Sequence, residues 1–298
     1  MWQGHIIRFI HRLDTYFDVI GVGNLEIMRA LRQRANLFMM KTMASNNPLR
    51  TKVHGLSMYI YPTTADGRAY LLGTFEPYTT ELFRRVIEPG MTVLDIGAQF
   101  GYYSLLAAKQ GAGKVYAFEP VPANFELLQR NIRMNDFTDI IHPVQRAVGA
   151  KQGLVTMFVY EGSDSHSMYR HPLVSVREKI SVECIPLDEF LGLEAVDVIK
   201  MDIEGHEPYA LQGMKQTIAS SNKLILFAEL APEYLRRAGA EPKDYLAQLS
   251  TLGFETQFID EHAYSLRSVS GEFLLGGYAG RYANLYCTKM TPEGERSS

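Results

Sequence analysis

Residues 93–104 read VLDIGAQFGYYS, an apolar run that leads directly into a turn with glycines at positions 97 and 101. Runs of this kind are typical of strands that are buried on both faces of a parallel sheet. Gly97 and Gly101 allow the backbone to turn sharply and to approach a ligand closely. In doubly wound sheets, ligands bind beyond the carboxyl ends of the strands. We therefore expect a ligand-binding turn here, followed by a helix.

Similar apolar runs recur along the chain and are separated by stretches with helical spacing. The runs occupy residues 92–97, 114–119, 196–202 and 223–229. Pro122 and Pro208 can each occupy the first turn of an intervening helix, and residues 244–252 followed by Gly253 read as another helix. Strands that alternate with helices imply a parallel sheet. We predict an α/β, Rossmann-like, doubly wound and mostly parallel sheet.

The segment before this domain has a different character. Residues 1–52 carry eight basic and three acidic side chains, and apolar residues recur at helical spacing over 6–17 and 27–38. We predict an N-terminal helical extension over residues 1–50, a domain over 51–290 and a disordered tail over 291–298. We expect the basic helices to pack against the main domain or a second subunit. Membrane association through residues 1–45 is the alternative. Residues 52–61 predict a short antiparallel hairpin, and residues 63–68 a turn.

Composition limits the class of protein. The chain is 46% hydrophobic and 21% charged, with a formal charge of −3, which is ordinary for a globular protein and gives no indication of nucleic-acid binding. Cys184 and Cys287 lack metal-like spacing, so we expect free thiols in a reducing compartment. No run of about 18 apolar residues occurs. We therefore expect a cytoplasmic protein.

Glu119 is the second chemical signal. It ends the apolar run 114–119, and a carboxylate at that place can accept hydrogen bonds from both hydroxyls of a ribose. The glycine turn and Glu119 together predict a nucleoside site. The turn lacks the G-x-G-x-x-G spacing that a dinucleotide requires, and Asp95 beside it would repel a pyrophosphate. Asp95 suits a ligand with an ammonium and a sulfonium group, which favours S-adenosylmethionine over NAD.

Three blocks of sequence, in order, resemble the FkbM-type family of S-adenosylmethionine-dependent methyltransferases. They are residues 73–80, which begin GTFEP, residues 93–104 with Phe118-Glu119-Pro120 and Asn131, and residues 199–207, which read IKMDIEGHE. The resemblance spans residues 73–260, and the third block is its most specific part. It implies a seven-stranded sheet of the class I methyltransferase type. The pair Gln99-Phe100 departs from the family pattern and changes the local shape of the pocket.

The resemblance also implies roles for individual residues. The methionine portion of the cofactor would be held by Asp95, Gly97, Ala98 and Gly101. The ribose would be held by Glu119 with Pro120, and the adenine by a loop at Ala147 and Val148. The near side of the cofactor would be closed by Phe75, Glu76 and Thr80.

Asp202, Glu204 and His206 are the candidate catalytic residues, since they follow the strand 196–202 and should face the transferred methyl group. His206 could take a proton from a hydroxyl acceptor, or it could be a histidine that starts a helix and bonds to backbone. Asp202, Glu204 and Glu229 could bind a divalent ion, but we favour helix capping and predict no metal. The polar residues 163–167 form either a substrate contact or a surface loop.

These features predict S-adenosylmethionine-dependent methylation of a hydroxyl on a small molecule, either a sugar or a polyketide-like metabolite. A non-catalytic nucleoside-binding adaptor that acts through the basic N-terminal helices is one alternative. A nicotinamide-dependent oxidoreductase is another. We expect no nucleic-acid partner, and a homo-oligomer stays open.

Overall fold

The computed structural model describes residues 47–161, 166–192, 194–269 and 282–290. The chain divides into two units, Met1–Phe75 and Glu76–Ser298. The division therefore falls after Phe75, whereas we placed a domain boundary after Arg50. The N-terminal helices, the membrane association through residues 1–45 and the tail over 291–298 lie outside the described residues and stay predictions.

The described part of the first unit is a hairpin followed by a helix. Strands β1 (Leu49–Val53) and β2 (Leu56–Ile60) pair antiparallel, as the sequence predicted. The predicted turn over 63–68 is wrong, because helix α3 (Ala65–Leu72) begins there. The Thr64 hydroxyl caps this helix by accepting a hydrogen bond from the Gly67 amide at 3.3 Å. Threonine caps helices well, and this local bond outweighs the turn propensity of the segment.

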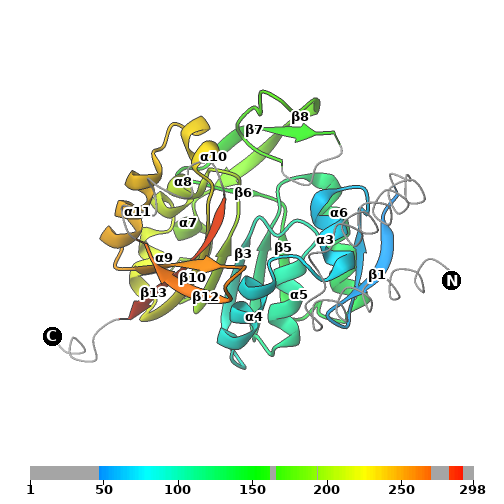
Figure 1. The fold of residues 1–298 in the computed structure, drawn as a ribbon, viewed down its shortest axis with the longest axis horizontal. Coiled ribbons are helices and arrows are strands. Elements are labelled where there is room, and N and C mark those ends of the chain that lie inside the picture. The colour runs from blue at the N-terminus through cyan, green and yellow to red at the C-terminus, as the bar shows by residue number, and fades with distance from the viewer. Residues whose placement is uncertain (1–46, 162–165, 193, 270–281, 291–298) are drawn as a thin grey trace, which may run out of the picture. The chain divides into compact units, whose positions relative to one another are not determined.

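The second unit is built on an eight-stranded sheet in the order β12-β11-β13-β10-β9-β3-β4-β5 (Figure 1). The strands are β3 (Thr92–Ile96), β4 (Lys114–Phe118), β5 (Ile141–Val144), β9 (Val198–Met201), β10 (Lys223–Leu230), β11 (Glu255–Asp260), β12 (Ser265–Ser268) and β13 (Ala283–Met290). Strands β5, β4, β3, β9 and β10 run parallel, and β13 lies antiparallel between β10 and β11. The mostly parallel, Rossmann-like sheet is as predicted, and β12 adds an eighth strand at one edge.

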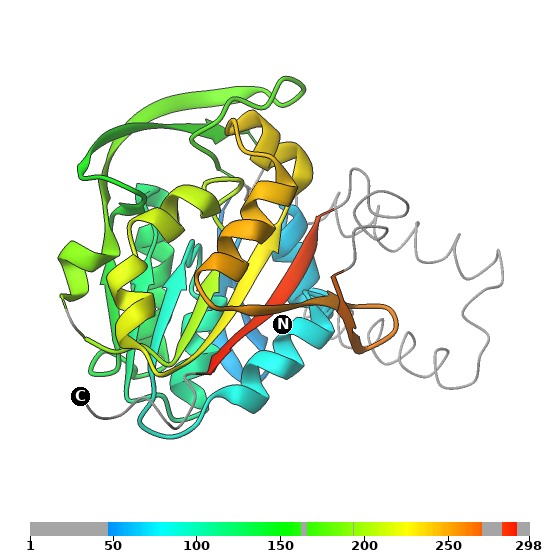
Figure 2. The ribbon, with the colours of Figure 1, turned by 90° about the vertical axis from the view of Figure 1, so that its left-hand side faces the viewer.

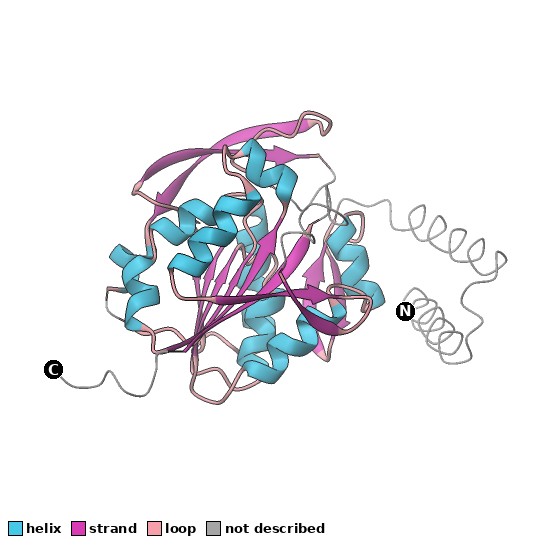
Figure 3. Cartoon of the chain, turned by 60° about the vertical axis from the view of Figure 1, so that its left-hand side comes forward, coloured by secondary structure: helices cyan, strands magenta, loops and turns pink. Residues whose placement is uncertain are grey.

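Helices cover both faces of this sheet (Figure 3). The helices are α4 (Pro77–Val86), α5 (Tyr102–Lys109), α6 (Pro122–Met134), α7 (Leu187–Leu191), α8 (Glu207–Gln212), α9 (Lys215–Ser220), α10 (Pro232–Arg237) and α11 (Pro242–Thr251). The helix expected after Pro208 is interrupted at Gly213 into α8 and α9. A side chain at Gly213 would lie 2.1 Å from the Gly149 carbonyl oxygen, so the chain at this break is held against a distant loop.

A second, three-stranded sheet is made of β6 (Ala147–Val148), β8 (Val176–Ile185) and β7 (Gly153–Tyr160), in that order. The long β7–β8 pair is antiparallel and forms its own layer of this unit (Figure 2). Its position matters for the site, because the chain between β7 and β8 reaches the segment after β9. There the Ser167 hydroxyl donates a hydrogen bond of 3.2 Å to the carbonyl oxygen of Glu204.

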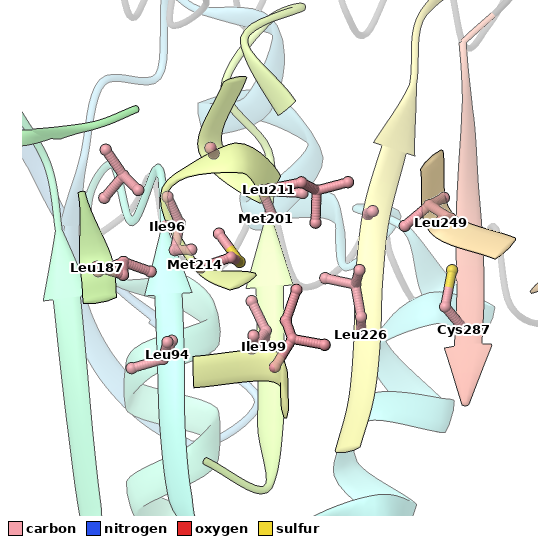
Figure 4. Close-up of a cluster of buried hydrophobic side chains, with 14 of the residues drawn as sticks. Leu94, Ile96, Leu187, Ile199, Met201, Leu211, Met214, Leu226, Leu249 and Cys287 are labelled. Atoms are coloured by element: carbon pink, nitrogen blue, oxygen red, sulfur yellow. The ribbon is translucent and has the colours of Figure 1, made fainter. Parts of the chain in front are cut away.

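The main core lies between the large sheet and the helices on one of its faces. Figure 4 shows side chains of β3, β9 and β10 meeting side chains of α7, α8 and α11, with Met214 between α8 and α9. All four residues of β9 are buried, as expected of a central strand covered on both faces. The core therefore holds the carboxyl ends of β3 and β9 firmly beside each other.

The described helices include none that is both long enough and apolar enough to cross a membrane. The chain's two cysteines, Cys184 and Cys287, are buried as free thiols, one on β8 and the other on β13.

Candidate functional site

The glycine turn after β3 is fixed by close backbone packing. Gly97 has a φ of +88°, and a Cβ there would lie 2.0 Å from the carbonyl oxygen of Asp202. The amides of Gly97 and Ala98 both donate hydrogen bonds of 2.9 Å to the carbonyl oxygen of Phe118, at the end of β4. Only glycine can satisfy this approach. The turn is thus held between the ends of β4 and β9, where the sequence predicted it.

The second glycine of the turn starts α5. Gly101 has a φ of +90°, and a Cβ there would lie 2.6 Å from Cδ1 of Leu128 on α6. Asn131 of α6 donates a hydrogen bond of 2.8 Å to the carbonyl oxygen of Phe100. Helix α6 therefore supports the turn from behind, which gives Asn131 a structural role that the sequence did not specify.

Asp95 is buried behind the turn. Its Oδ2 accepts hydrogen bonds from the backbone amide of Ser104 at 2.8 Å and from the Ser104 hydroxyl at 2.5 Å. Burial raises the pKa of Asp95 to about 6, against the opposing effect of the Ser104 bonds and of Lys200. The carboxyl group thus ties β3 to the first turn of α5. Its expected contact with the methionine portion of the cofactor stays a prediction.

Glu119 follows β4 and meets the glycine turn. Its Oε2 accepts a hydrogen bond of 2.9 Å from the Gln99 amide, and its Oε1 accepts one of 2.8 Å from the Val121 amide. Burial raises its pKa to about 7, although these backbone bonds oppose the shift. The Asn124 side chain also donates a hydrogen bond to this carboxylate. An ionised carboxylate has about four acceptor positions, so three protein donors still leave room for a hydroxyl of a ribose.

Glu76 and Thr80 lie on α4 and are bonded to the neighbouring elements. Glu76 accepts hydrogen bonds from the Tyr103 hydroxyl and, at 2.6 Å, from Nδ2 of Asn284 on β13. The hydroxyls of Thr80 and Tyr102 are 3.0 Å apart. The near side of the predicted cofactor site is therefore made of α4, the start of α5 and β13.

The other four residues predicted to bind the cofactor lie in different elements of the fold. Phe75 belongs to the first unit, where its ring centre lies 4.5 Å from that of Tyr70. Ala147 and Val148 were expected in a loop but form the buried strand β6, which pairs with β8. Pro120 is half-buried directly after Glu119. The roles of these four residues toward the cofactor stay predictions.

A buried lysine lies at the same sheet edge, and the sequence analysis missed it. The Nζ of Lys200 is 3.1 Å from Oδ2 of Asp202, 3.9 Å from Oε2 of Glu76 and 5.1 Å from the ring centre of Tyr103. Burial lowers the pKa of Lys200, but the carboxylates of Asp202 and Glu76 outweigh it and raise the pKa overall. A lysine inside the apolar run 196–202 was the available signal.

Glu229, at the end of β10, is a buried carboxyl group that interacts with this lysine. Burial raises the pKa of Glu229 well above its usual range, and Asp202, Glu204 and Glu207 add to that shift. Its Oε2 has no hydrogen-bond partner among the described residues. Those residues also include no group of three or more His, Cys, Asp or Glu that could hold a metal ion. Asp202 is paired with Lys200, and none of the three acids caps α8 or α10, so both the capping role and the absence of a metal stay predictions.

His206 lies at the start of α8, but its side chain does not cap the helix. Its Nδ1 is 2.8 Å from the Tyr169 hydroxyl, and its ring stacks on Tyr209 with centres 4.9 Å apart. Burial lowers the pKa of His206 to about 4. The suggested bond from the imidazole to backbone is therefore replaced by a bond to Tyr169, a residue that the sequence analysis did not single out.

A cavity of about 110 Å³ lies beside this loop. We call it the acceptor cavity; its lining residues are Tyr160, Ser167, Tyr169, His171, Val174, Glu204, Tyr234 and Arg237. Glu204 lines it directly, whereas His206 stands behind Tyr169. The three candidate catalytic residues therefore occupy different places. Asp202 pairs with Lys200, Glu204 lines the cavity, and His206 contacts the hydroxyl of the lining residue Tyr169. Ser167 also lines the cavity, and residues 162–165 of the polar loop lie outside the described part.

Comparison with known proteins identifies the family. The model of the methyltransferase FkbM domain matches residues 95–264. Hexuronic acid methyltransferase AglP of Haloferax volcanii is 28% identical over 166 residues, which cover 55% of this chain and 63% of that protein. Ribosomal protein L11 methyltransferase of Bacillus cereus is 36% identical over 85 residues, which cover 28% of this chain and 27% of that protein. Less than two thirds of each relative is therefore matched.

Among solved structures, the FkbM methyltransferase of Methylobacillus flagellatus is 17% identical with a TM-score of 0.42, and the match covers 85% of this chain and 58% of that one. The family model covers more than half of the present sequence and includes the glycine turn, Glu119 and the loop after β9. The chain belongs to the FkbM family of methyltransferases.

Proposed function

We propose that this protein transfers the methyl group of S-adenosylmethionine to a hydroxyl oxygen of a small molecule bound in the acceptor cavity. The observation that carries the proposal is the position of Glu204. It follows β9, whose end is in backbone contact with the glycine turn, and it also lines the acceptor cavity. A nucleoside at the turn and an acceptor in the cavity would therefore meet at one sheet edge.

S-adenosylmethionine, when bound, supplies a methyl group that is already activated for displacement. Glu119 would hold the ribose hydroxyls, and the backbone at Gly97 and Gly101 would leave room for the methionine portion. The protein's main contribution is to align the acceptor oxygen with the methyl carbon and the sulfur, since such positioning can supply roughly 7 to 11 kcal/mol. The close packing of the turn against β4 and β9 provides the required rigidity.

The acceptor hydroxyl must lose its proton as the new carbon–oxygen bond forms and the carbon–sulfur bond breaks. Tyr169 lines the acceptor cavity and its hydroxyl is 2.8 Å from Nδ1 of His206. We assign the proton to this pair: the acceptor proton moves to the Tyr169 oxygen while the Tyr169 proton moves to Nδ1 of His206. Because burial keeps the pKa of His206 low, the imidazole is neutral and able to accept at neutral pH.

The acceptor class is a small molecule, with a sugar favoured. The printed name of one relative, a hexuronic acid methyltransferase, supports a sugar. The cavity has a volume of about 110 Å³, so it can enclose only a small group of the acceptor. The free thiols at Cys184 and Cys287 support a cytoplasmic location.

The test is incubation of the full chain with methyl-labelled S-adenosylmethionine and a fractionated small-molecule extract, followed by mass spectrometry of every labelled product. The expected product carries a methyl ether that survives mild alkali, with one equivalent of S-adenosylhomocysteine released. Glu119→Ala is the matched variant and should transfer little label. An alkali-labile methyl ester or a labelled amine would contradict hydroxyl methylation, and the absence of cofactor binding would contradict the proposal as a whole.

A further inference from the structure

The acceptor cavity is built from three segments that are distant in the sequence. Tyr160 ends β7, residues 167–174 connect β7 to β8, Glu204 follows β9, and Tyr234 and Arg237 belong to α10. The proposed function favours a sugar but does not specify which class of sugar this combination recognises. The chemical character of the lining does carry that information.

Much of the wall is aromatic and is held rigidly. Tyr160 donates a hydrogen bond of 2.8 Å to the Tyr169 carbonyl oxygen and accepts one of 2.6 Å from the His171 amide. The rings of Tyr160 and Tyr234 each lie 6.4 Å from the ring of His171, in edge-on arrangements. These bonds fix the Tyr160 side chain to the backbone at Tyr169 and His171, so binding would cost little reordering of the wall. An aromatic wall offers apolar surface for the C–H groups of a sugar ring.

Arg237 is the only Lys or Arg of this lining. Its side chain is 15% exposed and its guanidinium lies 5.1 Å from the ring centre of Tyr234. One terminal nitrogen of the Arg237 guanidinium forms an ion pair with Glu233, whose side chain is 65% exposed. An ion pair with so exposed a partner contributes little to the stability of the protein. A guanidinium has five N–H donors in a planar fork that matches a carboxylate, so Arg237 retains donors for a ligand.

The opposite charge in the lining belongs to Glu204, whose carbonyl oxygen accepts the hydrogen bond from Ser167. Burial lowers the pKa of His171, and the positive charge of Arg237 lowers it further. Burial and the negative charge of Glu204 raise the pKa of Tyr234, whereas Arg237 lowers it, so both charges lie near this ring of the wall. An acceptor that carries one negative group would place it at Arg237 and would place its hydroxyls toward Glu204 and Tyr169.

From this arrangement we infer that the acceptor is an acidic sugar, a uronic acid or its glycoside, whose carboxylate binds Arg237 while its ring lies against the tyrosine and histidine walls. The inference rests on the proposed function for the position of the methyl group, but the binding of the carboxylate does not depend on turnover. Arg237 is thus a specificity-determining residue, and a neutral sugar of the same shape is the discriminating competitor.

The test compares glucuronate and galacturonate with glucose and galactose as acceptors at saturating methyl-labelled S-adenosylmethionine. Arg237→Ala and Arg237→Lys are compared with Arg236→Ala, which removes a neighbouring, 56% exposed arginine that does not line the cavity. We expect Arg237→Ala to lower kcat/KM for the uronates about 10- to 100-fold, mainly through KM, as for loss of a charge-assisted bond. Arg237→Lys should recover part of this loss, and Arg236→Ala should match the unchanged protein.

A binding measurement separates the two proposals. Calorimetry with glucuronate in the presence of S-adenosylhomocysteine should show heat for the unchanged protein and for Arg236→Ala, and little for Arg237→Ala. Methyl transfer to neutral sugars with equal efficiency, or equal uronate affinity in all variants, would overturn the acidic-sugar inference and leave the proposed function intact. Uronate binding that depends on Arg237 without methyl transfer would instead support the inference and contradict the proposed function. If the unchanged protein neither bound nor methylated a uronate, the inference would be overturned.

Discussion

The glycine turn and the acceptor cavity meet at one edge of the sheet but are built in opposite ways. The turn is made of consecutive residues, and backbone atoms in near contact determine its shape, as at Gly97 and Asp202. The cavity is lined by residues of β7, the β7–β8 connection, the loop after β9 and α10. On the proposed function, the contrast implies a constant ligand at the turn and a cavity whose specificity can change by substitution of single side chains. Four predictions test this contrast.

The largest effect is expected for Gly97→Ala. The new Cβ would lie 2.0 Å from the Asp202 carbonyl oxygen, and the residue would keep a φ of +88°. Overpacking together with the left-handed backbone should lower the free energy of unfolding by about 3 to 5 kcal/mol, measured by urea denaturation. Gly90→Ala is the matched control, since Gly90 has a φ of +85° with no atom within 4 Å of an added Cβ.

Gly90→Ala should lower the free energy of unfolding by only about 1 to 2 kcal/mol, because it adds the cost of a left-handed backbone without a steric clash. If Gly97→Ala and Gly90→Ala lost the same stability, the close approach of β3 and β9 would not be what fixes the turn, and the first half of the comparison would fail.

The next effect concerns the proton path on the cavity side. His206→Ala should lower kcat about 100-fold, because general base catalysis contributes roughly 10² or more, and it should leave cofactor affinity unchanged. Tyr169→Phe removes the hydroxyl that joins the imidazole to the cavity, so it should give a similar loss. The double variant should be little worse than either single variant, since both residues act as one unit.

Steady-state kinetics on the four proteins provides the measurement. Additive losses would show that Tyr169 and His206 act independently, and an unchanged kcat for His206→Ala would remove this residue from the mechanism.

A smaller effect is expected on the cofactor side for Glu119→Ala. Loss of charge-assisted hydrogen bonds to the ribose should weaken S-adenosylhomocysteine binding about 10- to 100-fold by calorimetry. Glu126→Ala, an exposed acid on α6, should bind as the unchanged protein does. Equal affinity in all three proteins would refute the ribose assignment of Glu119.

The smallest effect concerns pH. Between pH 5.5 and 7, the contribution of His206 to kcat should stay constant. Burial lowers its pKa from 6.5 to about 4, and a base is active above its pKa. Activity due to His206 should therefore persist down to about pH 5 and decline only as the pH falls through about 4. A pH profile of the ratio of kcat between the unchanged protein and His206→Ala tests this, and an acid limb near 6.5 would mean that the imidazole is more accessible than the structure shows.

The contrast also explains what the sequence could predict. The strands β3, β4, β9 and β10 were predictable because each is a short apolar run that is buried on both faces, a property of consecutive residues. The position of the glycine turn followed from the same local pattern, whereas the FkbM family was inferred from the resemblance of three sequence blocks. The assignment to this family is confirmed by the family model, whereas the roles of the individual cofactor residues stay predictions.

The other features depend on contacts between distant segments. The break between α8 and α9 arises from the approach of Gly213 to the Gly149 carbonyl oxygen, and β6 replaces a predicted loop because Ala147 and Val148 find partners on β8. Lys200 lies inside an apolar run, and its pairing with Asp202 and Glu76 could not be read from that run. The acceptor cavity was missed for the same reason, since no sequence window contains Tyr169, Glu204 and Arg237 together.

The place of β13 has a consequence for how the protein is assembled during synthesis. Strand β13 follows β11 and β12 in the chain, yet it lies between β10 and β11, so the β11–β12 hairpin has no other neighbour in the large sheet. Its residue Asn284 bonds to Glu76, and Glu261, just after β11, accepts hydrogen bonds from the amides of Tyr78 and Thr79 at the start of α4. A nascent chain that has not yet released β13 from the ribosome would leave β10 as an open edge and α4 without these partners. The bonds that fix the start of α4, beside the proposed nucleoside site, are therefore completed only after the last described strand has emerged.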